Sequence, residues 1–246
     1  MTVQAPAAKT PFSLFGVEIR IEASVLILAG VVGWTIGTGE LQIAAMTGAN
    51  VWLLLGVVIL GLGLSVLLHE MGHTLVGRAF GMKIDRITLH VFGGVAQFSR
   101  GPKTAVSELL MALAGPAVSV LLAGVFWILW QLSPGDTLPR AFHYLTQMNL
   151  VLALFNMAPA FPMDGGRVLR SLIWMFTGKV RLATTIAATL GVGLGLLLVA
   201  AGVGVVLTGG GVVNGVWMAV MGLMIANIAR ASRPKPRLAP AVPTGG

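Results

Sequence analysis

The stretch His69-Glu70-Met71-Gly72-His73 closes a long apolar run and decides how the rest of the chain is interpreted. Residues 51–68, which precede it, carry no charged side chain, so the motif stands inside what reads as a transmembrane helix. In a helix, His69 and His73 are four residues apart and lie on one face. Two imidazoles on one face can chelate zinc, and Glu70 between them is placed to act as general base. The stretch therefore predicts zinc-dependent hydrolysis within a membrane.

The composition supports a membrane protein and excludes several other classes. The chain is 56% hydrophobic and only 10% charged, whereas soluble domains carry about 25% charged residues. Cysteine is absent, so a disulfide framework, a thiolate metal site and a cysteine nucleophile are all excluded.

Hydrophobic runs predict the fold class, which is an α-helical polytopic membrane protein with about six transmembrane helices and small β-hairpins on the cytoplasmic side. We expect three parts: an N-terminal segment over residues 1–22, a six-span core over residues 23–230, and a basic, disordered cytoplasmic tail over residues 231–246. The predicted spans cover residues 23–39, 51–78, 105–131, 141–158, 184–207 and 212–230.

Two segments show the alternation of apolar and polar residues that is typical of β-strands. In residues 81–102, Ile84, Ile87 and Leu89 alternate with polar side chains, and the pattern predicts a hairpin that turns at Gly93-Gly94. A shorter strand pair is expected at residues 12–22, with its turn near Gly16.

The basic residues predict the orientation of the chain in the membrane. With the spans above, Arg140 alone among the 16 Lys and Arg residues falls on the second side. The positive-inside rule then places both termini and the hairpin of residues 81–102 in the cytoplasm. Because the net charge of +8 follows the membrane topology, it indicates contact with lipid headgroups rather than nucleic acid.

A catalytic zinc site needs a third protein ligand besides His69 and His73. His143 falls on the far side of the membrane by the charge pattern, and His90 lies in the predicted hairpin. Asp164 is the stronger candidate, because Pro159 and Pro162 must interrupt the fourth span just before it. A plain cytoplasmic turn is the alternative interpretation of this segment, and a turn can also present a ligand.

Taken together, these motifs resemble the site-2 protease family of intramembrane zinc metalloproteases. The resemblance rests on His69-Glu70-Met71-Gly72-His73 and on Asn156-x-x-Pro159-x-x-Pro162-x-Asp164-Gly165-Gly166 in a later span. Phe92-Gly93-Gly94, Ala114-Gly115-Pro116 and Gly16-Val17-Glu18-Ile19-Arg20 are also similar to family elements. The resemblance extends over nearly the whole chain, from about residue 12 to residue 230.

The resemblance implies one zinc ion per chain, bound by His69, His73 and Asp164, with Glu70 as catalytic acid and base. It implies that Asn156 holds the substrate backbone or its oxyanion, and that single-span or other transmembrane proteins are the substrates in regulated intramembrane proteolysis. The family usually has Asn three residues after the Gly-Pro pair, where this chain has Ser119. We expect a minimal prokaryotic member without PDZ or CBS domains, whose oligomeric state the sequence does not reveal.

The main alternative is a metal-ion or proton transporter, since intramembrane His, Glu and Asp also mark ion pathways. Transporters tend to contain internal repeats with interrupted helices at matching positions. The Pro159 and Pro162 interruption has no counterpart in the first half of the chain, so proteolysis is favoured.

Overall fold

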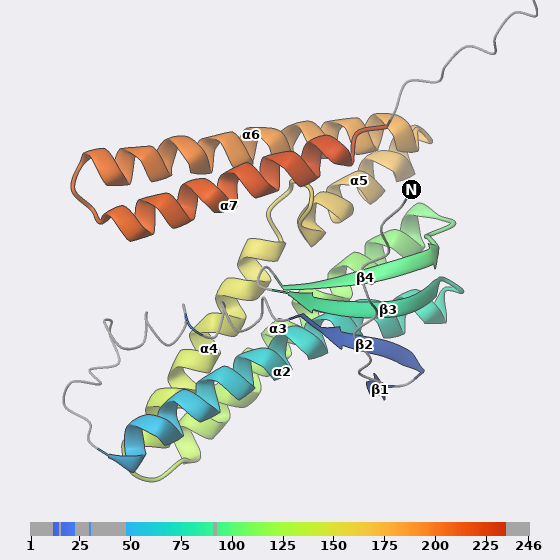
Figure 1. The fold of residues 1–246 in the computed structure, drawn as a ribbon. Coiled ribbons are helices and arrows are strands. Elements are labelled where there is room, and N and C mark those ends of the chain that lie inside the picture. The colour runs from blue at the N-terminus through green and yellow to red at the C-terminus, as the bar shows by residue number, and fades with distance from the viewer. Residues whose placement is uncertain (1–11, 15, 23–29, 31–47, 91–92, 235–246) are drawn as a thin grey trace, which may run out of the picture. The chain divides into compact units, whose positions relative to one another are not determined.

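The computed structural model describes residues 12–14, 16–22, 30, 48–90 and 93–234, which are coloured in Figure 1. The predicted first span, residues 23–39, and most of the predicted tail lie outside the described residues. The chain divides into two compact units, residues 1–157 and residues 158–246. The predicted three-part division of the chain stays a prediction.

Three helices of the first unit pack against one another: α2 (Ala49–Ala79), α3 (Ala105–Leu132) and α4 (Thr137–Asn156). Helices α2 and α3 confirm the second and third predicted spans, and both are long and apolar enough to cross a membrane. Helix α4 corresponds to the fourth predicted span and ends at Asn156, before the two prolines, as expected for an interrupted helix.

Helices α2 and α3 approach each other closely beside the His-Glu-x-x-His motif. A Cβ atom added to Gly72 would lie 2.9 Å from Val118 Cγ2 and 3.0 Å from the Ala114 carbonyl oxygen. The absence of a side chain at Gly72 therefore lets the backbone of α3 reach the motif, as small residues do in membrane helix pairs.

The four strands form one sheet in the order β1-β2-β3-β4. They are β1 (Phe12–Leu14), β2 (Val17–Ile21), β3 (Lys83–His90) and β4 (Gly93–Arg100). Both predicted antiparallel pairs are present, and β2 also pairs in parallel with β3, which joins the two hairpins. The predicted turn position was wrong. Gly93 and Gly94 belong to β4, where they pair with His90 and Leu89 of β3.

The sheet packs against α2 at the level of the motif. Val17, Ile19 and Ile87 form a buried cluster with Met71, the third residue of the motif. At the end of α2, the Arg78 guanidinium donates hydrogen bonds to the carbonyl oxygens of Gly16 and Ile84, at 2.9 and 3.2 Å. These contacts attach both hairpins to the helix that carries the metal motif.

An ion-pair network links the two parallel strands at their solvent face. Glu18 of β2 accepts hydrogen bonds from Arg20 at 2.7 Å and from Arg86 of β3 at 3.0 Å. Arg20, followed by Arg86, holds the pKa of the Glu18 carboxyl below its usual range. Because Glu18 is solvated, this network contributes little to stability and fixes the strand register instead.

The second unit contains α5 (Asp164–Thr177), α6 (Val180–Leu207) and α7 (Val212–Ala231). Helices α6 and α7 confirm the last two predicted spans, and they lie side by side in Figure 1. Their backbones touch where glycines face each other, since a Cβ on Gly195 would lie 2.5 Å from the Gly222 carbonyl oxygen. Helix α5 was not predicted; its sequence was interpreted as part of a cytoplasmic turn and loop.

Candidate metal centre

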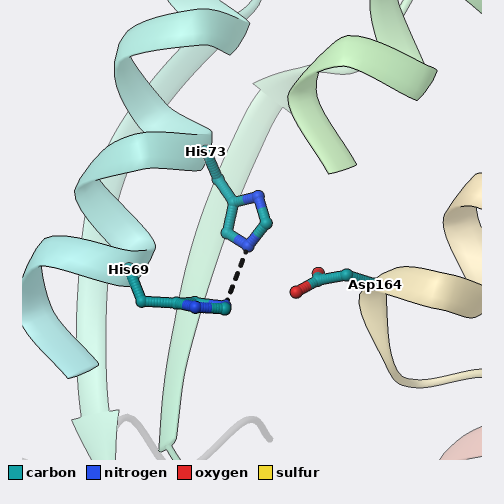
Figure 2. A group of neighbouring side chains, drawn as sticks. All are labelled: His69, His73 and Asp164. Carbon is teal, nitrogen blue, oxygen red and sulfur yellow. Dashed lines mark hydrogen bonds between the residues drawn. The ribbon is translucent and has the colours of Figure 1, made fainter. Parts of the chain in front are cut away.

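Two buried histidines from successive turns of α2 form the centre of the candidate site. His69 and His73 are 3% and 4% exposed, and their Nε2 atoms lie 3.2 Å apart. The rings meet edge to face, with centroids 4.9 Å apart and an interplanar angle of 80°. Figure 2 shows both side chains leaving α2 in the same direction, with the dashed line joining the two Nε2 atoms.

The second nitrogen of each ring contacts helix α3. His73 Nδ1 lies 2.7 Å from the carbonyl oxygen of Met111, which can only accept, so Nδ1 carries the hydrogen and donates it. His69 Nδ1 lies 2.8 Å from Ser119 Oγ, and the same tautomer lets it donate to that hydroxyl. In this tautomer both Nε2 atoms present lone pairs, as metal-binding histidines do when the other nitrogen is held by a neighbouring group.

The spacing of the two nitrogens fits zinc. Two nitrogens bound to one tetrahedral zinc ion, each at 2.0–2.1 Å, are about 3.3 Å apart, close to the 3.2 Å between the Nε2 atoms. With the hydrogen on each Nδ1, both Nε2 lone pairs face the space between the rings, where one cation can accept them both. Gly115 of α3 keeps the space open, because a Cβ there would lie 2.7 Å from His69 Nε2 and closer still to His73 Nε2.

Glu70 lies between the two histidines in sequence and is half-buried. Successive residues of an α-helix are about 100° apart around the axis, so Glu70 flanks the histidine face, and Met71 points on toward the sheet. A carboxylate in this position can exchange protons with a molecule held at the two Nε2 atoms.

Asp164 is the first residue of α5 in the second unit, and its side chain is 9% exposed. A carboxylate at a helix N-terminus is stabilised by the helix dipole. The segment before Asp164 is fixed within its own unit, since the Phe161 N–H donates to the Ala187 carbonyl oxygen at 3.1 Å. Gly166 and Gly191 allow this close packing, because a Cβ at either position would meet the backbone of residues 160–161.

The remaining sequence candidates occupy different surroundings. Asn156 is the last residue of α4, is half-buried, and donates from Nδ2 to the Leu152 carbonyl oxygen at 3.0 Å. The His143 ring packs against Trp130 at an interplanar angle of 54°, with ring centroids 4.2 Å apart, and is not a member of the metal-ligating group found among the described residues. The side chain of His90 lies outside the described residues.

Within the first unit, the structure brings His69 and His73 together and adds three groups whose contacts with the histidines the sequence analysis did not predict. These are the Ser119 hydroxyl, the Met111 carbonyl oxygen and the open space at Gly115. The motif Ala114-Gly115-Pro116 was a usable signal for Gly115. A backbone carbonyl such as that of Met111 leaves no signal in a sequence. Asp164 is labelled in Figure 2 and belongs to the other unit, so its role as the third ligand stays a prediction.

Comparisons with known proteins agree with this geometry. The model of Peptidase family M50 matches residues 57–147 and 135–200. The protein sll0528 of Synechocystis sp. is 37% identical over 194 residues, which are 77% of this chain and 50% of that protein. Zinc metalloprotease MJ0392 of Methanocaldococcus jannaschii is 34% identical over 76% of this chain and 51% of its own length. The chain thus spans about half the length of these curated relatives.

A solved structure, the site-2 protease from Methanocaldococcus jannaschii, superimposes with a TM-score of 0.64 and 28% identity, covering 94% of this chain and 97% of that one. The chain therefore belongs to Peptidase family M50, the site-2 protease family, and is a multi-pass integral membrane protein.

Proposed function

We propose that this protein is a zinc-dependent intramembrane protease that hydrolyses peptide bonds within transmembrane segments of other membrane proteins. The observation that carries the proposal is the buried pair of Nε2 atoms, 3.2 Å apart, with each Nδ1 held by α3. Asp164 completes the candidate set of metal ligands, and we expect one zinc ion per chain. Family membership favours proteolysis over the alternative of ion transport.

Zinc, when bound, lowers the pKa of a water molecule and polarises the scissile carbonyl. Glu70 accepts a proton from the attacking water, so that the water oxygen forms a bond to the carbonyl carbon. Glu70 then returns the proton to the amide nitrogen as the carbon–nitrogen bond breaks. Ser119 and the Met111 carbonyl hold the two imidazoles in one tautomer and orientation throughout.

Asn156 is the proposed contact for the substrate. Its Nδ2 already donates one hydrogen bond to Leu152, and the amide has a second N–H and an acceptor oxygen to offer. We expect this group to hold the substrate backbone or the developing oxyanion.

A transmembrane helix hides its carbonyl groups in intrahelical hydrogen bonds, so the substrate must unwind before attack. An unwound segment needs new backbone partners, and an edge strand can supply them. Strand β4 is an edge of the sheet, and the sheet packs on α2 beside the motif. We expect the unwound segment to pair with this edge.

The proposed location is the inner membrane of a prokaryotic cell, with both termini in the cytoplasm and lipid headgroups around the basic residues. Arg78 supports this orientation, because it is a basic residue in the last turn of α2, at the end where basic residues mark the cytoplasmic side. Alkaline phosphatase fused after Arg233 is expected to stay inactive, since it folds only outside the cytoplasm, whereas a fusion after Gly135 is expected to be active. The reverse pattern would contradict the orientation.

The test of the proposed function combines a zinc measurement with a cleavage assay on the full chain in detergent. The substrate probe is a tagged single-span test protein whose membrane segment carries a Gly-Pro pair, because such a pair lowers the cost of unwinding. We expect about one zinc per chain and cleavage that a chelator stops and zinc restores. Asp164→Asn should bind much less zinc and should not cleave the probe.

Asp136→Asn is the matched control, because it makes the same chemical change at an exposed site beside α4. This variant should keep both zinc and activity. A normal zinc content in Asp164→Asn would remove Asp164 from the ligand set. A wild-type chain that holds zinc but cleaves no helix-broken segment would argue against proteolysis.

A further inference from the structure

A buried polar pair connects α2 with α4 one helical turn before His69. Ser65 and Asn149 are 1% and 0% exposed, and Asn149 Nδ2 donates to Ser65 Oγ at 3.0 Å. Each side chain also bonds to its own helix, Ser65 to the Gly61 carbonyl and Asn149 to the Leu145 carbonyl, both at 2.8 Å. Neither residue belongs to the motifs that define the metal site.

A second contact packs the same two helices together one turn earlier. A Cβ on Gly61 would lie 2.6 Å from Leu145 Cδ1, one turn before the Ser65–Asn149 hydrogen bond. Both contacts join residues that are 84 positions apart. Helices α2 and α4 therefore run in parallel and in register, and a step of four residues along one matches a step of four along the other.

Continuing this register carries the contact to the metal site. One turn beyond Ser65 and Asn149, Ala153 falls level with His69, and the same spacing of 84 positions places Asn156 level with Gly72, one residue before His73. Asn149 and Asn156 are seven residues apart, so they share a face of α4 to within about 20°. The hydrogen bond between Ser65 and Asn149 thus fixes the depth at which Asn156 stands relative to the two histidines.

The geometry of the pair suits a role in setting the register of the two helices. Both N–H groups of Asn149 have acceptors, one on α2 at Ser65 and one on its own helix at Leu145. A hydrogen bond has a narrow range of distance and angle, so this one restricts sliding of α4 along α2 more sharply than an apolar contact does.

We propose that Ser65 and Asn149 are positioning residues for proteolysis, which hold Asn156 at the depth of the histidines by fixing the register of α4 against α2. This inference rests on the proposed role of Asn156 in the reaction. Loss of the pair should misplace Asn156 while leaving the zinc ligands on α2 intact. A displacement of about 1 Å in a catalytic group can cost about 100-fold in rate.

The experiment measures kcat, KM, zinc content and thermal unfolding for Ser65→Ala and Asn149→Leu, with the single-span test protein as substrate. We expect kcat to fall by about tenfold or more in both variants, while KM, zinc content and the unfolding temperature change little. Ser65→Ala adds no volume, so it remains informative if leucine at position 149 overpacks the interface. Thr146→Val is the matched control, because the Thr146 hydroxyl donates to the Phe142 carbonyl oxygen of its own helix and not to α2. This variant should keep full activity.

Repeating the changes in an Asn156→Ala background tests whether the pair acts through Asn156. We expect no further loss of kcat there, whereas an added loss of the same size would overturn the inference. An unchanged kcat in both single variants would overturn it as well. If Asn156→Ala itself kept full activity, the proposed role of Asn156 would fail first, and the two failures are thereby distinguished.

Discussion

Glu70→Gln is expected to abolish cleavage while the chain still binds about one zinc ion. The amide has the shape of the carboxylate but cannot take a proton from water or return it to the leaving nitrogen. The proposed metal ligands His69 and His73 keep their contacts with α3, so zinc content should not change. We expect kcat to fall by about 100-fold to 10,000-fold, the range typical of a lost general base.

The measurement for Glu70→Gln is zinc per chain beside cleavage of the single-span test protein. Glu22→Gln provides the matched control, because Glu22 is exposed and follows strand β2, and this variant should cleave normally. Retained cleavage in Glu70→Gln would remove Glu70 from the mechanism. Loss of zinc in the same variant would mean that Glu70 has a structural role at the site.

Gly115→Ala is expected to remove zinc and activity together, through a single added methyl group. The Cβ would lie 2.7 Å from His69 Nε2, within a distance that real Cβ atoms do not adopt. The imidazoles cannot easily give way, because both are nearly fully buried and each is held through Nδ1 by α3. We expect zinc affinity to fall by about 10-fold to 100-fold or more, as for lost support of metal ligands.

Gly124→Ala separates this local effect from any general effect of alanine in α3. Gly124 stands on the same helix with open space around its Cβ position, so the variant should bind zinc and cleave as the unmodified chain does. Zinc titration and thermal unfolding of the two variants in detergent give the comparison. Equal zinc affinity in both would show that α3 can move away from the histidines.

The sequence was sufficient for α2, α3, α6 and α7, because hydropathy and length report directly on lipid burial. Helix α5 escaped prediction for two reasons. Asp164, Gly165 and Gly166 form turns in most proteins, and the helix has only 14 residues, too few to register as a span. The signal was present in Val168, Leu169, Leu172 and Ile173, whose spacing gives an apolar face, and in Gly178, whose φ of 67° ends the helix.

The sequence predicted which side chains form the candidate site, but it did not predict the contacts from other elements that hold them in place. His-Glu-x-x-His placed His69 and His73 on one face of one helix, a purely local consequence of helical geometry. The parallel pairing of β2 with β3 joins residues more than 60 positions apart, and neither strand carries a pattern that names its partner. The contacts of Ser119 and of Asn149 likewise depend on how separate helices pack, which periodicity within one helix does not encode.

The two histidines differ in whether a mutation can remove the group that orients them. His69 is oriented by the Ser119 hydroxyl, and many single substitutions at that position delete the partner. His73 is oriented by a main-chain carbonyl at Met111, which every amino acid possesses. A comprehensive variant library would therefore score position 119 as sensitive, while position 111 would respond only to the size and polarity of its side chain. The orientation of His69 can therefore change through mutation of its partner side chain, whereas the partner of His73 is a backbone group that no substitution removes.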